Sequence, residues 1–344
     1  MTETKKSIMS GMRPTGKLHI GHYMGVLQNW LKFQEEYDCY FMLADWHTLT
    51  TKFDKTDDLK QNIVDVTLDW IASGIDPEKS TIYLQSHIPE IAELHVLFSM
   101  ITPQNWVERN PTLKDFVKML RGNIEEQEKA AQDVSTIVSY GLMGYPVLQS
   151  ADILMFNATM VPVGTDQLAH LEFSRDVARR FNHIYKTDLF VEPQPKLTET
   201  PLLKGIDGQK MGKSFNNDIK ISDSEEETAK KLMKAITDRS RIKRTDPGHP
   251  DQCEVICPYF KIFADEETVK EQRYNCENAI WGCADCKRKL AVIMNDYFRE
   301  IREKRKELEQ KPDYVHEIIR AGSEKARKTA SENLARIKDA MGLY

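Results

Sequence analysis

The stretch GMRPTGKLHIGH, residues 11–22, decides the expected fold. It follows a short apolar run, Ser7–Met9, and leads into an amphipathic helical pattern that extends to about Gln34. A strand, a glycine-containing turn and a helix start can bind phosphate, because the helix start offers unpaired backbone N–H groups and a positive dipole end. His19 and His22 lie three residues apart, so both should share one helix face and point at one ligand. Two solvated histidines at a helix start would show the same local pattern.

Further apolar runs continue this pattern through the first half of the chain. The runs Cys39–Ala44, Thr81–Leu84 and Met160–Val163 are each followed by polar or turn residues and then by a helical pattern. This alternation predicts a Rossmann-like parallel sheet with helices on its faces. Ligands of such a sheet bind outside the carboxyl ends of its strands.

The second part of the chain has a different pattern. Residues 204–218 combine glycines, lysines and amides with little apolar periodicity, which predicts an exposed loop between two domains. Residues 222–242 and 287–340 have helical spacing. The expected fold class is therefore α/β, with a catalytic domain at residues 1–215 and a mainly α-helical domain at residues 216–344, whose final helix has the length to pack back on the first domain.

Composition limits the classes of protein and partner. The 344 residues are 40% hydrophobic and 29% charged, and they contain neither an apolar run long enough to cross a bilayer nor a signal-peptide pattern. We therefore expect a cytoplasmic protein with no membrane partner. Because the net charge is −5, any nucleic acid must be held by a local basic patch. Two basic runs are candidates, although a solvated helix surface explains each equally well: Arg241 with Lys243 and Arg244, and Lys287 with Arg288 and Lys289.

Five of the six cysteines lie between Cys253 and Cys286. Disulfides are not expected in a cytoplasmic chain, so this crowding indicates metal. Cys253, Cys276, Cys283 and Cys286 have the spacing C-x22-C-x6-C-x2-C. Structural zinc usually joins two short C-x2-4-C pairs, and only one such pair is present, so the spacing favours a [4Fe-4S] cluster, with Zn2+ as the alternative. Cys257 has apolar neighbours and is interpreted as a buried thiol.

The helix start also matches a known signature. His19-Ile20-Gly21-His22 is identical to the HIGH motif of class I aminoacyl-tRNA synthetases, and Lys210-Met211-Gly212-Lys213-Ser214 resembles their KMSKS loop. The order, separation and strand context of the two motifs agree with that family. Both are needed, because attack of a carboxylate on the α-phosphorus builds negative charge that preorganised cations and N–H donors stabilise. Gly212 departs from the usual serine, which removes one hydroxyl donor.

The resemblance to class I synthetases implies that ATP binds with Mg2+ between the two motifs. His19 and His22 would contact phosphates, and Gly21 would pack under adenine. Lys210 and Lys213 would hold the departing pyrophosphate. The other ATP-site residues that it implies are Arg13, Pro14, Thr15, Leu202, Met211, Gly212 and Ser214, the last of them also as a catalytic residue.

A third element, VPVGTDQ at residues 161–167, ends a predicted strand and begins a helical pattern. Thr165 or Asp166 would make a good helix N-cap, which is a sufficient structural reason for their presence. The element also resembles the GEDQ segment of tryptophanyl-tRNA synthetases, with Thr165 in place of the acidic residue. That resemblance implies that Gly164, Thr165 and Asp166 line the ATP site and that Gln167 reaches the bound amino acid.

Tyr145, Gln149 and Asp152 are the polar residues of an otherwise apolar segment, GYPVLQSADILMF. Their spacing of four and three residues places them on one face of a helix. A buried hydrogen-bond network would account for them. The functional alternative is that Asp152 accepts an indole N–H, a donor-only group, at the end of an apolar pocket. Such a pocket rejects side chains that lack the matching donor.

The arrangement YPxLxxADI followed by VPVGxDQ is similar to that of bacterial tryptophanyl-tRNA synthetases. The resemblance places Asp152 on the indole-binding aspartate and assigns the α-amino group to Tyr145 and Gln167. Gln149 departs from the usual methionine. The tryptophan-binding residues that it implies are Met9, His47, Tyr145, Gln149, Asp152 and Gln167.

By this resemblance, the chain converts L-tryptophan and ATP to tryptophanyl-adenylate and pyrophosphate and then transfers tryptophan to its tRNA. The helical part would recognise the anticodon, and the protein would be a homodimer. The alternatives are a tyrosyl-tRNA synthetase, which Asp152 and the VPVGxDQ segment disfavour, and a small-molecule nucleotidyltransferase of the HxGH type, which the long helical region disfavours. A non-catalytic RNA-binding relative would have no need of the two histidines and two lysines.

Overall fold

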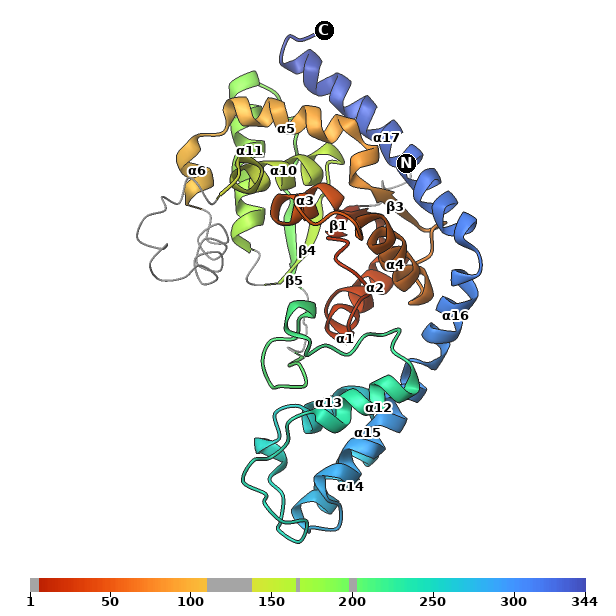
Figure 1. The fold of residues 1–344 in the computed structure, drawn as a ribbon. Helices are drawn as coiled ribbons and strands as arrows, with labels where there is room; N and C mark the ends of the chain where they lie inside the picture. The colour runs from red at the N-terminus through yellow and green to blue at the C-terminus, as the bar shows by residue number, and fades with distance from the viewer. Residues whose placement is uncertain (1–5, 110–137, 165–167, 198–202) are drawn as a thin grey trace.

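A computed structural model of the chain describes residues 6–109, 138–164, 168–197 and 203–344 (Figure 1). The chain forms an α/β body from which a helical region extends at one end (Figure 1). No helix within these described ranges is long and apolar enough to span a membrane.

Five parallel strands form one sheet in the order β3-β2-β1-β4-β5. The predicted strands all occur, and the Rossmann-like class is confirmed. β5 was not predicted from the sequence, because it is a short edge strand whose proline would be out of place in a sheet centre. The order changes direction between β1 and β4, so a ligand crevice is expected where these two strands end. The strands are β1 (Ser7–Met12), β2 (Asp38–Leu43), β3 (Ser80–Leu84), β4 (Met160–Val163) and β5 (Gln194–Leu197).

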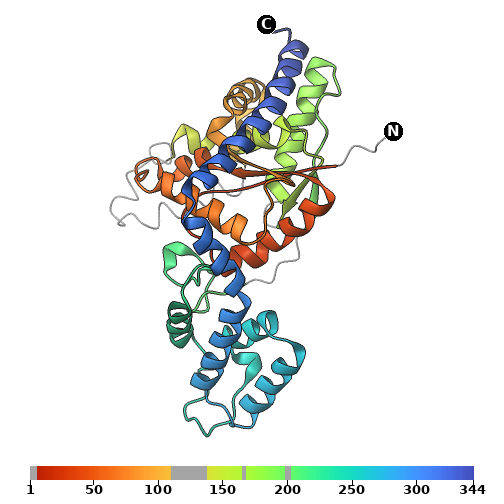
Figure 2. The same ribbon diagram turned by 90° about the vertical axis from the view of Figure 1, so that its right-hand side faces the viewer.

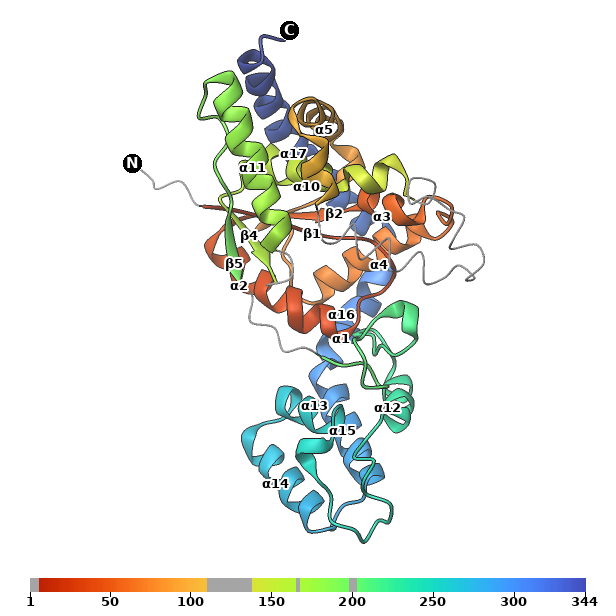
Figure 3. The same cartoon turned by 90° about the vertical axis from the view of Figure 1, so that its left-hand side faces the viewer.

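Alternating side chains of the strands divide the core into two layers. Ile8 and Phe41 pack with helices α2 and α4 on one face, where the Trp30 ring stacks on Phe41 with centroids 4.1 Å apart. Met9 and Tyr40 pack with α5, α10 and α11 on the other face (Figure 3). The helices of this part are α1 (Ile20–His22), α2 (Gln28–Glu36), α3 (Asp45–Lys52), α4 (Leu59–Ala72), α5 (Pro89–Ile101), α6 (Gln104–Glu108), α10 (Tyr140–Met155) and α11 (Leu168–Tyr185), with a π-helix (Tyr23–Leu27) between α1 and α2 and a 3-10 turn (Gln85–His87) after β3.

The region after residue 218 is mostly helical, as predicted, but the helix expected over residues 222–242 ends at Lys234. Ala235 leaves the helical conformation (φ −59°, ψ 144°), and the Ile236 N–H donates to the Ile206 carbonyl (2.8 Å) in place of a partner within the helix. The helices here are α12 (Glu225–Lys234), α13 (Ile256–Phe263), α14 (Glu266–Glu277), α15 (Cys283–Tyr297), α16 (Arg299–Glu309) and α17 (Pro312–Ala340), with 3-10 turns at Lys213–Phe215 and Pro250–Gln252.

The final helix, α17, runs back along the α/β body (Figure 2). Its Gly322 lies against β3 so closely that a Cβ atom there would be 1.8 Å from the Ile82 carbonyl oxygen. The next residue, Ser323, accepts a hydrogen bond from the Leu84 N–H (3.1 Å). The glycine and the serine therefore fix α17 to the free edge of the sheet at β3, which leaves that edge covered.

Candidate active site

Residues 13–19, the turn that the sequence predicts to bind a nucleotide and that we call the nucleotide turn, lie between the end of β1 and the start of α1. His19 is the N-cap residue of α1: its Nδ1 accepts from the His22 backbone N–H (3.3 Å), and the Nδ1 of His22 accepts from the His19 N–H (3.5 Å). The two rings stack with centroids 3.7 Å apart. Because each Nδ1 is an acceptor, each neutral ring carries its proton on Nε2.

Both histidines are uncharged at neutral pH. Burial, assisted by the nearby charge of Lys213, lowers the pKa of His19 to about 4. Burial and the neighbouring His19 lower the pKa of His22 well below its usual value. The pair can thus donate two Nε2–H groups to an anion without a proton having to be taken up first.

Gly21 is required by the stacked histidines. A Cβ atom at this position would lie 3.0 Å from Cε1 and from Nδ1 of the His19 ring. The helix predicted to extend to about Gln34 ends at Glu36, and its middle, Tyr23–Leu27, is a π-helix. π-helical turns within longer helices are frequent at functional sites.

The lysine loop reaches across to the nucleotide turn. Lys213 Nζ donates to the Gly16 carbonyl and lies 3.5 Å from Thr15 Oγ1. Burial lowers the pKa of Lys213 to about 8, and the negative charge of Asp69 opposes that shift. The Lys210 side chain is exposed. The structure therefore brings Lys213, but not Lys210, into contact with the turn, while the Ser214 side chain lies outside the described part.

The chain segment after the lysine loop pairs with the start of the HIGH motif. The Ile20 N–H donates to the Ile219 carbonyl (2.9 Å), and the Ile221 N–H donates to the Leu18 carbonyl (3.0 Å). His19 and Lys220 form an antiparallel bridge between these bonds. Two motifs about 190 residues apart in sequence are thus held together by backbone hydrogen bonds.

A cavity of about 350 Å3 opens at the carboxyl ends of β1 and β4, which is the position expected from the strand order. This volume is within the range of small-molecule sites. Tyr145, Gln149 and Asp152 all line this cavity, so the prediction that they share one face of a helix is confirmed. The other residues that line the cavity are Met9, Ser10, Gly11, Arg13, Met42, Ala44, His47, Thr50, Leu142, Ile153, Val161, Pro162, Val163 and His170.

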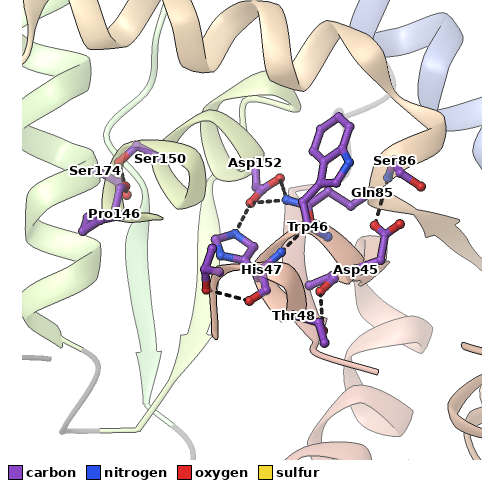
Figure 4. Close-up of polar contacts among 12 residues, drawn as sticks. Asp45, Trp46, His47, Thr48, Gln85, Ser86, Pro146, Ser150, Asp152 and Ser174 are labelled. Carbon is purple, nitrogen blue, oxygen red and sulfur yellow. Dashed lines mark hydrogen bonds and ion pairs between the residues drawn. The ribbon is translucent and has the colours of Figure 1, made fainter. Parts of the chain in front are cut away.

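Asp152 is fully buried in the wall of this cavity (Figure 4). Its Oδ1 accepts from Gln85 Nε2 (2.8 Å), and its Oδ2 accepts from His47 Nε2 (2.8 Å). Burial raises the pKa of Asp152, and the hydrogen bond from His47 opposes the rise. Carboxylate oxygens have further lone pairs, so Asp152 can accept another N–H from a ligand without losing either partner.

Gln85 and His170 were missed by the sequence reasoning. Gln85 Oε1 accepts from the backbone N–H groups of Trp46 (3.1 Å) and His47 (3.4 Å), so one side chain orients both α3 and Asp152 (Figure 4). Its position directly after β3, at the carboxyl edge of the sheet, was the available signal. His170 Nε2 lies 3.4 Å from the Tyr145 hydroxyl, and no motif pointed to it.

Some predicted site residues cannot be placed at this cavity. Thr165, Asp166, Gln167 and Leu202 lie outside the described residues. Pro14 lines a separate cavity of about 190 Å3 with Lys52, Lys55 and Asn62.

The cysteines of the helical region lie near one another without forming a metal cage. Among the residues that the structure describes, no group of three or more His, Cys, Asp or Glu side chains is arranged to hold a metal ion. The sulfurs contact protein partners instead: Cys257 accepts from Gln272 Nε2 (3.3 Å), and Arg241 Nη1 is 4.0 Å from the Cys276 Sγ. Cys257 is buried, as predicted. The expected centre of Cys253, Cys276, Cys283 and Cys286, whether [4Fe-4S] or Zn2+, is thus not supported by the geometry.

Known proteins match along almost the whole chain. Residues 1–299 match the family of class I tRNA synthetases (W and Y). The tryptophan–tRNA ligase of Aquifex aeolicus is 41% identical in an alignment 397 positions long, which covers 98% of this chain and 99% of that protein. The ligase of Thermotoga maritima is 42% identical over 337 residues, with the same coverage. The crystal structure of tryptophanyl-tRNA synthetase from Campylobacter jejuni, complexed with ADP and tryptophan, is 35% identical, has a TM-score of 0.86, and covers 98% of this chain and 100% of that one.

Proposed function

This chain belongs to the class I tRNA synthetases for tryptophan and tyrosine and is a tryptophan–tRNA ligase, and from that premise we propose how its residues divide the reaction. The Asp152 cavity binds L-tryptophan, and the turn at His19 and His22 binds the triphosphate of ATP. The carboxylate of tryptophan attacks the α-phosphorus, pyrophosphate leaves, and tRNA then receives the activated amino acid. The observation that supports this division best is the fully buried, hydrogen-bonded Asp152 beside the nucleotide turn.

Recognition of the indole follows from the chemistry of the cavity wall. Asp152 accepts the indole N–H, while His47 and Gln85 keep the carboxylate in position. The apolar lining of the cavity includes Met9 and Val161. A side chain without a donor at this depth forgoes the hydrogen bond to the carboxylate, so the cavity favours tryptophan over such side chains. Tyr145, Gln149 and Gln167 are assigned to the rest of the amino acid, as the sequence suggested.

Neutral N–H donors and lysine side chains stabilise the negative charge of the phosphates. His19 and His22 present Nε2–H groups, and Lys213, which donates to the Gly16 carbonyl of the same turn, is assigned to the departing pyrophosphate. Lys210, whose side chain is exposed, is assigned to the same pyrophosphate. Mg2+ supplies further positive charge to the triphosphate when it is bound. Other residues assigned to ATP are Arg13, Pro14, Thr15, Gly21, Gly164, Thr165, Asp166, Leu202, Met211, Gly212 and Ser214.

The decisive experiment is exchange of radioactive pyrophosphate into ATP with each of the twenty amino acids in turn. We expect exchange with tryptophan and none with the other nineteen. Exchange with tyrosine in place of tryptophan would favour the tyrosyl alternative. Exchange that needs no amino acid would instead indicate a small-molecule nucleotidyltransferase.

We assign the tRNA to the helical region and divide the chain into a catalytic domain at residues 1–215 and an anticodon-binding domain at residues 216–344. The basic run Arg241, Lys243 and Arg244 lines a cavity of about 630 Å3 with Arg288, and clustered cations of this kind suit a phosphate backbone. A homodimer in the cytoplasm is the expected state. Sedimentation of the native chain tests the dimer directly.

A [4Fe-4S] cluster on Cys253, Cys276, Cys283 and Cys286 stays a proposal. The donors are chemically suited, because all are thiols and three of them are buried in the same helical region. The sulfurs would have to converge on binding. The cluster would fix the local shape of the tRNA-facing region. Protein purified without oxygen should be brown, with broad absorption near roughly 400 nm. Colourless protein that holds one zinc per chain would contradict the proposal.

A further inference from the structure

Two buried arginines on α16 lie beside the nucleotide turn. Arg305 donates to the carboxylates of Asp65 and Asp69 on α4, and its Nη1 also donates to the Asp65 carbonyl (3.0 Å). Its side chain is only 3% exposed. Asp69 is fully buried. A buried ion pair of this kind is a poor source of net stability, because removing both charges from water offsets their attraction.

The second carboxylate oxygen of Asp69 leads directly to the nucleotide turn. Asp69 Oδ2 accepts from the Leu18 backbone N–H at 2.7 Å. Leu18 is itself buried and immediately precedes His19. One carboxylate therefore joins Arg305 of the helical region to the backbone of the residue that precedes the first histidine of the HIGH motif.

Arg302, almost one turn earlier on α16, is connected to the Leu18 carbonyl through Ile221. Its Nε donates to the Ile221 carbonyl (3.2 Å), and the Ile221 N–H donates to the Leu18 carbonyl (3.0 Å). Nη1 and Nη2 of Arg302 donate to Asn295 (2.8 Å) and Thr228 (2.9 Å), which fix the guanidinium. Both backbone polar groups of Leu18 are thus connected, each through one intermediate residue, to α16.

We propose that Arg305 with Asp69, and Arg302 with Ile221, are positioning residues that set the orientation of His19 for adenylate formation. The inference rests on the proposed role of His19 in phosphate binding. One of these hydrogen bonds holds each of the two peptide planes that flank Leu18. The chain at Leu18 can turn only if one of them breaks, and turning the plane that leads into His19 would move the N-cap and its stacked partner, His22. Displacements of about 1 Å in a reacting group can cost roughly a hundredfold in rate. In this arrangement α16, a helix of the C-terminal region, fixes the orientation of the two histidines.

The pair of Arg305 and Asp69 also influences which groups near the nucleotide turn are charged. Burial raises the pKa of Asp69 to about 6, and the positive charge of Arg305 opposes the rise. Asp69 in turn opposes the lowering of the Lys213 pKa. Loss of Arg305 would therefore favour the neutral acid at Asp69 and weaken its hold on the Leu18 N–H, with a secondary effect on Lys213.

The test compares Asp69→Ala with Asp65→Ala. The two aspartates lie one turn apart on α4 and share Arg305, but only Asp69 contacts Leu18. We expect Asp69→Ala to slow tryptophan-dependent pyrophosphate exchange by about tenfold to a hundredfold, with unchanged tryptophan affinity. Asp65→Ala should lower the melting temperature without a comparable loss of rate. Equal rate losses in the two variants, or a loss of tryptophan affinity in Asp69→Ala, would show that the pair merely braces the fold.

Two further measurements keep the test valid if Asp69→Ala folds poorly. Asp69→Asn retains an oxygen that can accept from Leu18, so it should recover part of the lost rate. Hydrogen exchange of a peptide that contains residues 14–22 should be faster in Asp69→Ala than in Asp65→Ala, and equal protection in both would overturn the inference. If the unmodified protein shows no tryptophan-dependent exchange, the proposed function fails, which is distinct from failure of this inference.

Discussion

The proposed amino-acid cavity and the proposed phosphate site differ in how their side chains are held in the free protein. In the cavity, Asp152 lies on α10 and already has hydrogen-bond partners from the 3-10 turn after β3 and from α3. The phosphate site is assembled from two distant segments, and its Lys213 contacts backbone and a threonine where an anion should bind. The cavity is thus suited to select a ground-state ligand. The phosphate site is suited to respond to charge that appears during the reaction.

Replacing Lys213 should produce the largest effect and would sharpen this contrast. Lys213→Ala should slow pyrophosphate exchange by about a hundred- to a thousandfold, which corresponds to about 2.7–4 kcal/mol for one transition-state contact. Tryptophan affinity should stay unchanged. Lys210→Ala is the natural comparison, because Lys210 belongs to the same loop but is exposed, and we expect it to slow exchange as well. Unchanged exchange in both variants would exclude the loop from catalysis.

Replacing Asp152 probes the other side of the comparison. Asp152→Ala should weaken tryptophan binding by about 1–3 kcal/mol, because the indole N–H is left unpaired. Titration calorimetry with tryptophan measures the loss. Ser150→Ala is a matched control: Ser150 lies on the same helix, is equally buried and is bonded to Ser174 (2.9 Å), away from the cavity lining (Figure 4). If Asp152→Ala lowers only the melting temperature, Asp152 belongs to the core and the cavity is not selective.

A smaller effect is expected at Gly21, where the site depends on close packing. Gly21→Ala would place a methyl group 3.0 Å from the His19 ring and displace the stacked histidines. We expect exchange to slow by roughly tenfold, since small displacements of catalytic groups are costly. Gly141→Ala is the control, because its Cβ would meet nothing closer than 3.9 Å. Equal rates for the two variants would show that the histidine geometry tolerates movement.

The same contrast explains what the sequence could predict. The HIGH turn, the lysine loop and the polar face of α10 are local patterns, so their spacing, together with the resemblance to a known family, located them. Gln85 and the Arg305–Asp69 pair depend on contacts between residues 67 and 236 positions apart, which no local pattern records. The edge strand β5 lacked a signal because it is short and contains proline. The cysteine spacing predicted a metal site, but spacing does not fix where the sulfurs point.

The smallest expected effect is a pH dependence that belongs to the phosphate site alone. Burial lowers the pKa of Lys213 to about 8. A lysine is charged below its pKa, so the free enzyme loses this positive charge as the pH rises through about 8. We therefore expect kcat/KM for ATP to fall a few-fold between about pH 7.5 and pH 9, since kcat/KM reports groups of the free enzyme.

Lys213→Arg provides the control, because a guanidinium keeps its charge throughout this range. Its activity would be lower overall, but the alkaline fall attributable to Lys213 should disappear. Tryptophan affinity, which depends on the preformed cavity, should not follow the same curve. If kcat/KM for ATP falls with the same midpoint in the arginine variant, the titrating group is not Lys213. The two sites would then not differ in how they respond to charge.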